Sequence, residues 1–144
     1  MEKDNSTKLI RSGLKRTEFM ETSEPLFLTS GFVYNSAEEA EDAFKERKKR
    51  FMYSRFGNPT VQMLQDKLAD IEGAEVCWCT STGMAAVFTI FMSFLKKGDR
   101  VVAGRALFGS CHHIITKILP RFGIEIELID GKDLNAWEKA LKKR

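Results

Sequence analysis

The stretch EVCWCTSTGMAAVFTIFMSFLKKGDRVVAG, residues 75–104, decides the fold. Its two ends, 75–79 and 100–104, are short apolar runs of the kind that form buried strands, and residues 83–95 between them have the length and apolar content of a helix. We therefore predict a strand, a helix and a strand. This order favours a parallel sheet with right-handed crossovers and helices on its faces, which is an α/β fold.

The alternation continues toward the C-terminus. We predict a helix that begins near Ser110 and ends around Pro120, a strand over 124–129, and a last amphipathic helix that Asp133 caps. Three parallel strands would leave an open sheet edge, and parallel sheets are normally larger and covered on both faces. We therefore expect the sequence to be a piece of a longer protein.

Before residue 75 the chain has a different character. Residues 1–12 are polar and are expected to form a mobile arm, and residues 13–35 are expected to be extended, because Pro25 excludes a regular helix. This part is not expected to form a domain of its own.

Two helices are expected between this extended part and residue 75. Ser36 and Glu39 form a capping box that predicts a helix over about 37–50, with an acidic first turn and a basic last turn. The Asn-Pro pair at 58–59 starts a second helix, which Gly73 ends.

Composition sets limits on the class of protein. The chain has 144 residues, and its 23 basic and 20 acidic residues give a net charge of only +3. So balanced a charge gives little support to a nucleic-acid partner, and none is expected. The longest apolar stretch, 84–95, is much shorter than the roughly 20 residues of a membrane span. We expect it to be a buried core helix, and we expect no membrane contact.

The cysteines are odd in number, and their spacing is not that of zinc ligands. Cys77, Cys79 and Cys111 include a C-x-C pair but no C-x-x-C pair. We interpret them as small buried side chains in a reducing compartment, the cytoplasm. The adjacent His112 and His113 point to different faces of a helix and are not expected to share a metal ion. No metal site is expected.

Two turns are candidates for binding an anion. TSTGM, 80–84, lies where a strand ends and a helix begins, and a helix N-terminus offers unpaired N–H groups to a phosphate. Gly83 would let the anion approach the backbone, and Ser81 or Thr82 could add a hydroxyl. The alternative is a plain turn in which Thr82 only caps the helix.

The second turn is YSRFGNP, 53–59. The Arg55 guanidinium could donate forked hydrogen bonds to phosphate beside the Tyr53 hydroxyl, or Arg55 could be an ordinary surface arginine. Phe108 follows another predicted strand at the same presumed ligand end. An aromatic ring there could stack on a planar ligand.

Several motifs occur together in one order: YSRFGNPT, ADIEGAEVCWCTSTGMAA, LKKGDRVV, LFGSCHHI and RFGIEIELID. They resemble the N-terminal third of the Cys/Met-metabolism family of pyridoxal-phosphate enzymes. SEPLFLTSGFVY and GRALFGSC look most like its O-succinylhomoserine sulfhydrylase branch. The resemblance implies the aspartate aminotransferase-like fold type I, incomplete in this chain. Residues 1–58 would be an arm and helix that contribute to the neighbouring subunit's site, and residues 59–144 the first part of the cofactor-binding domain.

The resemblance also assigns the two turns. The Gly83 and Met84 N–H groups would bind the phosphate of pyridoxal 5′-phosphate in their own subunit, and Tyr53 and Arg55 would reach it from the neighbouring subunit of a homodimer or homotetramer. Phe108 falls at the ring-stacking position, where many relatives have tyrosine. Stacking would survive that change, but a hydroxyl role in proton transfer would not.

The activity implied is γ-replacement: sulfide replaces succinate on O-succinylhomoserine to give homocysteine, in methionine biosynthesis. Cystathionine γ-synthase and O-acetylhomoserine sulfhydrylase are alternatives, and a non-catalytic module that binds a phosphate ligand is an alternative of another class. The family's Schiff-base lysine and the aspartate that pairs with the pyridine nitrogen would lie beyond Arg144. We therefore expect no catalytic residue in this chain and no turnover by these 144 residues alone.

Overall fold

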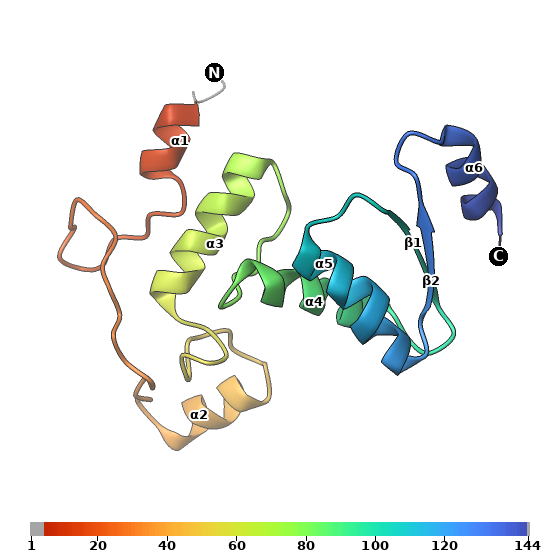
Figure 1. Ribbon diagram of the computed structural model, residues 1–144. Helices are drawn as coiled ribbons and strands as arrows, with labels where there is room; N and C mark the ends of the chain where they lie inside the picture. Colours follow the sequence, from red (N-terminus) through yellow and green to blue (C-terminus); the bar gives the residue numbers. More distant parts are fainter. Residues whose placement is uncertain (1–4, 144) are drawn as a thin grey trace. The chain divides into compact units, whose positions relative to one another are not determined.

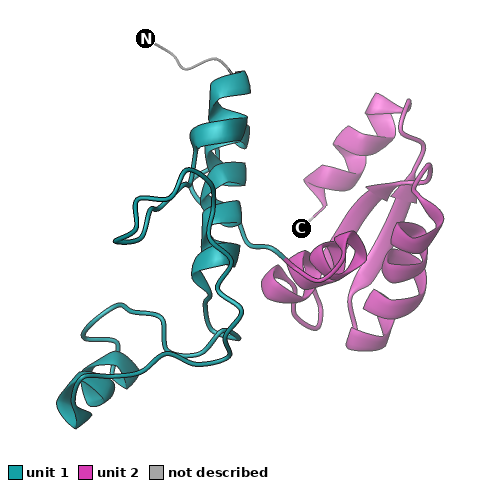
Figure 2. Cartoon of the chain, turned by 90° about the vertical axis from the view of Figure 1, so that its left-hand side faces the viewer, with its two compact units in different colours: residues 1–79 teal, residues 80–144 magenta. Residues whose placement is uncertain are grey.

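The computed structural model describes residues 5–143. They fall into two compact units: unit 1, up to residue 79, and unit 2, from residue 80 onward (Figure 2). Unit 1 contains three helices: α1 (Asn5–Arg11), α2 (Ala37–Phe44) and α3 (Pro59–Glu72). Unit 2 contains, in order, α4 (Gly83–Phe94), β1 (Arg100–Gly104), α5 (Gly109–His113), η1 (Ile114–Ile118), η2 (Leu119–Phe122), β2 (Glu125–Ile129) and α6 (Leu134–Lys142) (Figure 1).

Unit 2 is an α/β unit with a parallel ladder. β1 and β2 pair in parallel, with Arg100 opposite Glu125 and Gly104 opposite Ile129. The strands predicted at 100–104 and 124–129 are thereby confirmed, the second with its start at Glu125, and so are the helix that follows residue 82 and the helix that Asp133 caps.

Helices cover both faces of this ladder. The buried cluster of Ile114, Ile115, Leu119 and Ile124 packs against α4 and against one face of the strands, formed by Val101, Ala103, Ile126 and Leu128. On the other face, the Arg100 guanidinium pairs with Glu127 at 2.9 Å and donates to the Ala140 carbonyl of α6 at 2.6 Å. The predicted arrangement, a parallel sheet between helices, is present over these two strands.

The helical segment between the strands changes its pitch twice. It starts as α5, continues as a π-helix over η1 and ends as a 3-10 helix over η2. Pro120 has no N–H to donate, so it interrupts the regular ladder of the helix, and Gly123, with φ of 74°, closes the segment. The start predicted near Ser110 is therefore right, and the end lies two residues beyond the predicted one.

The strand predicted at 75–79 is wrong for this structure. No backbone hydrogen bond joins these residues to another segment within 5–143, and the ladder contains β1 and β2 alone. An apolar run becomes a strand only where a neighbouring strand offers its N–H and C=O groups. The predicted burial of Cys77, Cys79 and Cys111 is also wrong, because all three are only partly buried, as free thiols.

Helix α4 is less buried than its composition predicts. None of its side chains is buried, and Ile90 and Phe94 are exposed. The core of unit 2 covers one side of α4, and the described residues of unit 2 leave Ile90 and Phe94 uncovered.

In unit 1, α1 replaces part of the predicted mobile arm. The helix contacts α3, and the Ser12 hydroxyl after it donates to the Asp70 carboxylate. Gly13 then packs directly on the α3 backbone, with φ of 73°. Residues 13–35 are non-helical, as predicted, and residues 1–4 of the predicted arm lie outside the described residues.

Helix α2 ends at Phe44, not near residue 50. Lys45 is the C-cap and Glu46 has a positive φ of 57°, so the basic run expected as the last turn leaves the helix. Lys48 and Arg50 fold back to Glu39 in the first turn of α2. The segment thus leaves the helix and contacts its first turn, although its residues have a local preference for helix.

Candidate functional site

The turn before α4 keeps two backbone donors free. Thr82 is the N-cap, and its hydroxyl accepts from the Ala85 N–H at 3.0 Å. Gly83 and Met84 lie in the first turn of α4, where backbone N–H groups have no acceptor within their own helix. Within residues 5–143, no other acceptor binds these two N–H groups. The space beside the Gly83 Cα is open to 4 Å. Thr82 therefore caps the helix, and the turn can still receive an anion.

Phe108 belongs to the same edge of the ladder. It lies between β1 and α5, its side chain is 75% exposed, and its carbonyl accepts from the His112 N–H at 2.9 Å. α4 leads into the amino end of β1 and contacts α5, which begins after the carboxyl end of β1 (Figure 1). Leu107 and Met84 both pack against the core of unit 2. Unit 2 thus brings the free N–H groups and an exposed aromatic ring to the carboxyl edge of its strands.

Tyr53 and Arg55 are close together in unit 1. The Arg55 guanidinium carbon lies 4.8 Å from the centre of the Tyr53 ring and 5.1 Å from that of Phe56, as in cation–π contacts. In the part of the chain that the structure describes, no carboxylate lies within ion-pair distance of Arg55. Its planar fork of N–H donors is therefore available to an anion.

Asn58 holds this loop in place, a role that the sequence indicated only in part. Its side-chain oxygen Oδ1 accepts from the Thr60 N–H at 2.9 Å, as expected of an N-cap. Its amide nitrogen also donates to the Phe27 carbonyl and to the Ser54 hydroxyl, each at 2.9 Å. The second role depends on a segment 31 residues earlier, which no local pattern could indicate.

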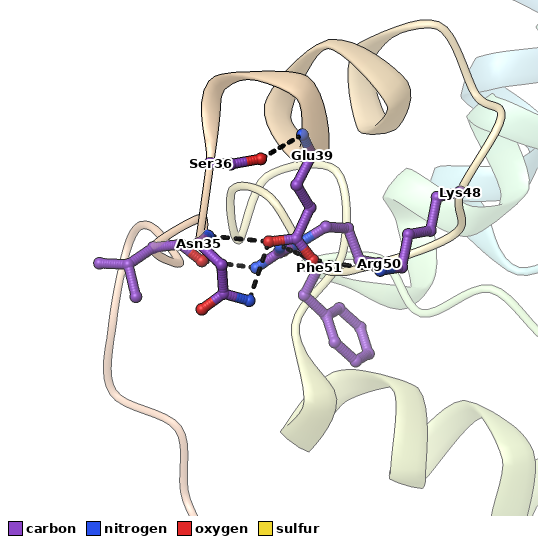
Figure 3. Close-up of polar contacts among 7 residues, drawn as sticks. Asn35, Ser36, Glu39, Lys48, Arg50 and Phe51 are labelled. Carbon is purple, nitrogen blue, oxygen red and sulfur yellow. Dashed lines mark hydrogen bonds and ion pairs between the residues drawn. The ribbon is translucent and has the colours of Figure 1, made fainter.

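Glu39 is the second residue whose role the sequence did not show. Its carboxylate accepts from the Asn35 backbone N–H at 2.8 Å and the Asn35 side-chain amide at 3.0 Å, and it pairs with Arg50 at 2.9 Å and Lys48 at 3.2 Å (Figure 3). The Asn35 N–H, Lys48 and Arg50 together lower the pKa of Glu39 from 4.5 to about 2. The capping box predicted from Ser36 is present, since the Ser36 hydroxyl accepts from the Glu39 N–H at 3.1 Å.

This lowered pKa gives a prediction for acid stability. Because the folded protein binds a proton at Glu39 less readily than the unfolded chain does, the stabilisation is complete above about pH 4.5 and is lost as the pH falls toward about 2. Urea unfolding of the protein and of its E39Q variant between pH 6 and pH 2 measures this. The difference in unfolding free energy should shrink toward zero at the acid end. A difference that stays constant over this range would contradict the assignment.

The structure groups the five predicted site residues into two sets. Tyr53 and Arg55 lie in unit 1, and Gly83, Met84 and Phe108 lie in unit 2. Within residues 5–143, no group of three or more His, Cys, Asp or Glu side chains is arranged to hold a metal ion. No helix in the same range has the length and apolar content needed to span a membrane.

Residues 6–144 match the family of Cys/Met metabolism PLP-dependent enzymes. The chain belongs to this family. Family members depend on pyridoxal phosphate, and their fold is fold type I, of which this chain contains a part with a small parallel sheet. The family resemblance, the α/β fold class and the cofactor predicted from the sequence are thereby confirmed.

Several curated relatives in this family are sulfhydrylases. The chain is 48% identical over 132 residues to the O-succinylhomoserine sulfhydrylase of Mycobacterium tuberculosis, covering 92% of this chain and 32% of that protein. It is 38% identical to the Pseudomonas aeruginosa protein of the same name and 33% identical to the L-methionine gamma-lyase of Treponema denticola, covering 94–95% of this chain and 34% of each. The chain therefore spans about a third of the length of these relatives.

Solved structures of the family superpose on almost the whole chain. A Campylobacter jejuni structure, whose description names O-acetylhomoserine (thiol)-lyase and N′-pyridoxyl-lysine-5′-monophosphate, matches with a TM-score of 0.88 and 26% identity over 96% of this chain and 34% of that one. The metB structure from Corynebacterium glutamicum matches with a TM-score of 0.86 and 28% identity over 97% of this chain and 35% of that one.

The residues present fit the family's cofactor. Gly83 and Met84 offer N–H groups without a partner, and the space beside the Gly83 Cα is open. Phe108 offers an exposed ring at the same edge of the strands, and Arg55 offers a cationic fork to a phosphate. These are the groups that bind a phosphate and a planar aromatic ring.

Proposed function

We propose that the protein is a pyridoxal-phosphate-dependent O-succinylhomoserine sulfhydrylase, which replaces succinate by sulfide to form homocysteine in methionine biosynthesis. The observation that carries the proposal is the pair of free N–H groups at the same edge of the strands as an exposed Phe108, in a chain 48% identical to a relative of that name. In this proposal residues 59–144 start the cofactor domain, and residues 1–58 reach the site of a neighbouring subunit in a cytoplasmic homodimer or homotetramer.

Each site residue has a defined task in this proposal. The N–H groups of Gly83 and Met84 bind the cofactor phosphate from the helix N-terminus, where the helix dipole also favours an anion. Arg55 binds the same phosphate with two parallel N–H donors, beside the Tyr53 hydroxyl. The Phe108 ring stacks on the cofactor ring and, because it has no hydroxyl, transfers no proton. When bound, pyridoxal phosphate supplies the electron sink that makes replacement at the substrate's γ carbon possible.

The test is a substrate comparison on the protein expressed from its complete open reading frame and loaded with pyridoxal phosphate. With O-succinylhomoserine and sulfide, we expect homocysteine and succinate to form in equal amounts. Faster reaction with O-acetylhomoserine, or with cysteine in place of sulfide, would replace the proposal by one of these neighbouring activities. Release of thiol from L-methionine alone would favour a lyase. The isolated 144 residues are expected to show no turnover with any of these substrates.

Arg55 gives a prediction for cofactor affinity. Replacing Arg55 by methionine removes charged hydrogen bonds worth about 1.5–3 kcal/mol each, so the Kd for pyridoxal phosphate should rise by at least about tenfold, the factor for losing one of them. Absorbance titration of the apoenzyme measures this. R55K should lie between the two, because lysine keeps the charge but loses the planar fork.

The matched control is R121M. Arg121 is an exposed arginine in η2, just before the amino end of β2, where no part of the proposed site lies. Its replacement should leave the Kd unchanged. An R55M protein that binds the cofactor as tightly as R121M would contradict the role of Arg55.

A further inference from the structure

We propose that Glu39 is a positioning residue for cofactor binding: through Arg50, its carboxylate holds the backbone segment that presents Tyr53 and Arg55. This inference rests on the proposed function, because it takes Tyr53 and Arg55 to bind the cofactor phosphate. Glu39 itself lies on α2 and is not proposed to touch the phosphate.

The first step is the link from Glu39 to Arg50. The two side chains, 15% and 20% exposed, approach to 2.9 Å (Figure 3). The other end of the Arg50 guanidinium donates to the Val33 carbonyl at 2.5 Å, and its carbon lies 4.5 Å from the centre of the Tyr34 ring. The guanidinium is therefore held by a carboxylate, a backbone carbonyl and an aromatic face, and Glu39 supplies the only opposite charge among these three.

The second step runs from Arg50 along the backbone to residues 53–55, which are proposed to bind the cofactor phosphate. The Phe51 ring packs on Phe32 with centres 5.8 Å apart, and the Phe32 N–H donates to the Met52 carbonyl at 3.1 Å. Tyr53 itself forms an isolated antiparallel bridge with Gly31.

The pairing continues past Tyr53. The Ser54 N–H donates to the Ser30 carbonyl at 2.9 Å, and the Ser54 hydroxyl donates to the Thr29 carbonyl. Residues 50–54 thus lie along residues 29–33 as a short antiparallel pair. Because its register fixes which way each side chain points, a shift at Arg50 is passed on to Tyr53 and Arg55.

The third step is the reason why the carboxylate charge matters. Glu39 accepts from three groups besides Arg50: the backbone N–H and side-chain amide of Asn35, and Lys48. A carboxylate can satisfy this number of donors because both oxygens only accept. A glutamine would turn N–H donors toward some of them, and the pairing with Arg50 and Lys48 would lose its charge.

The experiment measures the Kd for pyridoxal phosphate in the protein expressed from its complete reading frame, by absorbance titration of the apoenzyme. For E39Q we expect the Kd to rise about tenfold, the loss of one charge-assisted contact. Turnover at saturating cofactor should stay close to that of the unchanged protein. A general loss of folded protein would instead lower the maximal turnover.

The matched control is E41Q. Glu41 lies two residues away on α2 and forms an ion pair of the same chemistry with Lys45, but this pair does not reach residues 50–54. The Kd of E41Q should be unchanged. A second variant, R50M, should raise the Kd at least as much as E39Q, because it also removes the contacts with Val33 and Tyr34. The double variant should be no worse than R50M alone, because E39Q acts through Arg50.

Three outcomes decide the matter. If R55M weakens cofactor binding but E39Q does not, the positioning role is overturned while the proposed phosphate site stands. If neither variant weakens binding, the loop does not bind the cofactor phosphate, and both the proposed phosphate role and the positioning role are overturned. If E39Q does not yield folded protein, R50M takes over the test, because it removes the charge with which Glu39 pairs. An R50M protein with an unchanged Kd would then overturn the inference.

Discussion

Replacing Leu119 by alanine is expected to lower the free energy of unfolding by about 2–5 kcal/mol, the range for deleting a buried leucine side chain. Leu119 is 0% exposed and lies in the cluster with Ile114, Ile115 and Ile124, against which α4 and one face of both strands pack. The cavity would lie between layers that are already only two strands wide, so little neighbouring structure is available to fill it. Urea unfolding monitored by fluorescence measures the loss.

The same substitution at Leu134 is the control. Leu134 is 77% exposed at the start of α6, so L134A removes the same atoms with little loss of burial. Its unfolding free energy should change by at most about 0.5 kcal/mol. If L119A and L134A unfold at the same urea concentration, the cluster around Leu119 is not the core of unit 2.

Replacing Gly13 by alanine is expected to detach α1 from α3. A Cβ at Gly13 would lie 2.3 Å from the Met63 carbonyl oxygen and 2.9 Å from the Lys67 nitrogen, both of them backbone atoms of α3. The residue also has a φ of 73°, a conformation that costs a residue with a side chain about 1 kcal/mol or more. We expect hydrogen exchange of the α1 amides to quicken by at least about tenfold, since a loss of about 1.4 kcal/mol is sufficient for that.

Two other glycines separate the two causes of this effect. Gly73 also has a positive φ, 64°, but open space around the position of a Cβ, so G73A reports the backbone strain alone. Gly131 has open space and no positive φ, and G131A should change nothing. If G13A exchanges no faster than G73A, the close contact with α3 is not what holds α1 in place.

The elements that sequence reasoning predicted correctly are those with local signals. Asn58 and Gly73 mark the ends of α3, because an N-cap and a left-handed C-cap are properties of single residues. The run 100–104 is a strand because its partner, 125–129, follows within one crossover. Phe108 could be assigned to the carboxyl edge of the sheet because it follows β1, whereas the placement of Gly83 relied on the predicted strand at 75–79, which is not present.

The features that were missed depend on contacts that a local pattern does not contain. Beyond the end of α2, Lys48 and Arg50 turn back to Glu39, and the capping and charge pattern that predicted a longer helix does not indicate this contact. The run 75–79 has the composition of a strand, but composition cannot supply the neighbour on which a strand depends. The sequence did not indicate the ion pairs of Glu39, because the capping box alone already accounts for a glutamate at this position.

The π-helical turn at 114–118 explains how two consecutive isoleucines can both be buried. A wider turn spreads each full rotation over more residues, so Ile114 and Ile115 lie closer to one face than neighbours on an α-helix would. On an ordinary α-helix, with its larger rotation per residue, one of these isoleucines would be turned further from the face that packs on the core. The pitch of this segment is therefore as much a packing feature as the identity of its side chains.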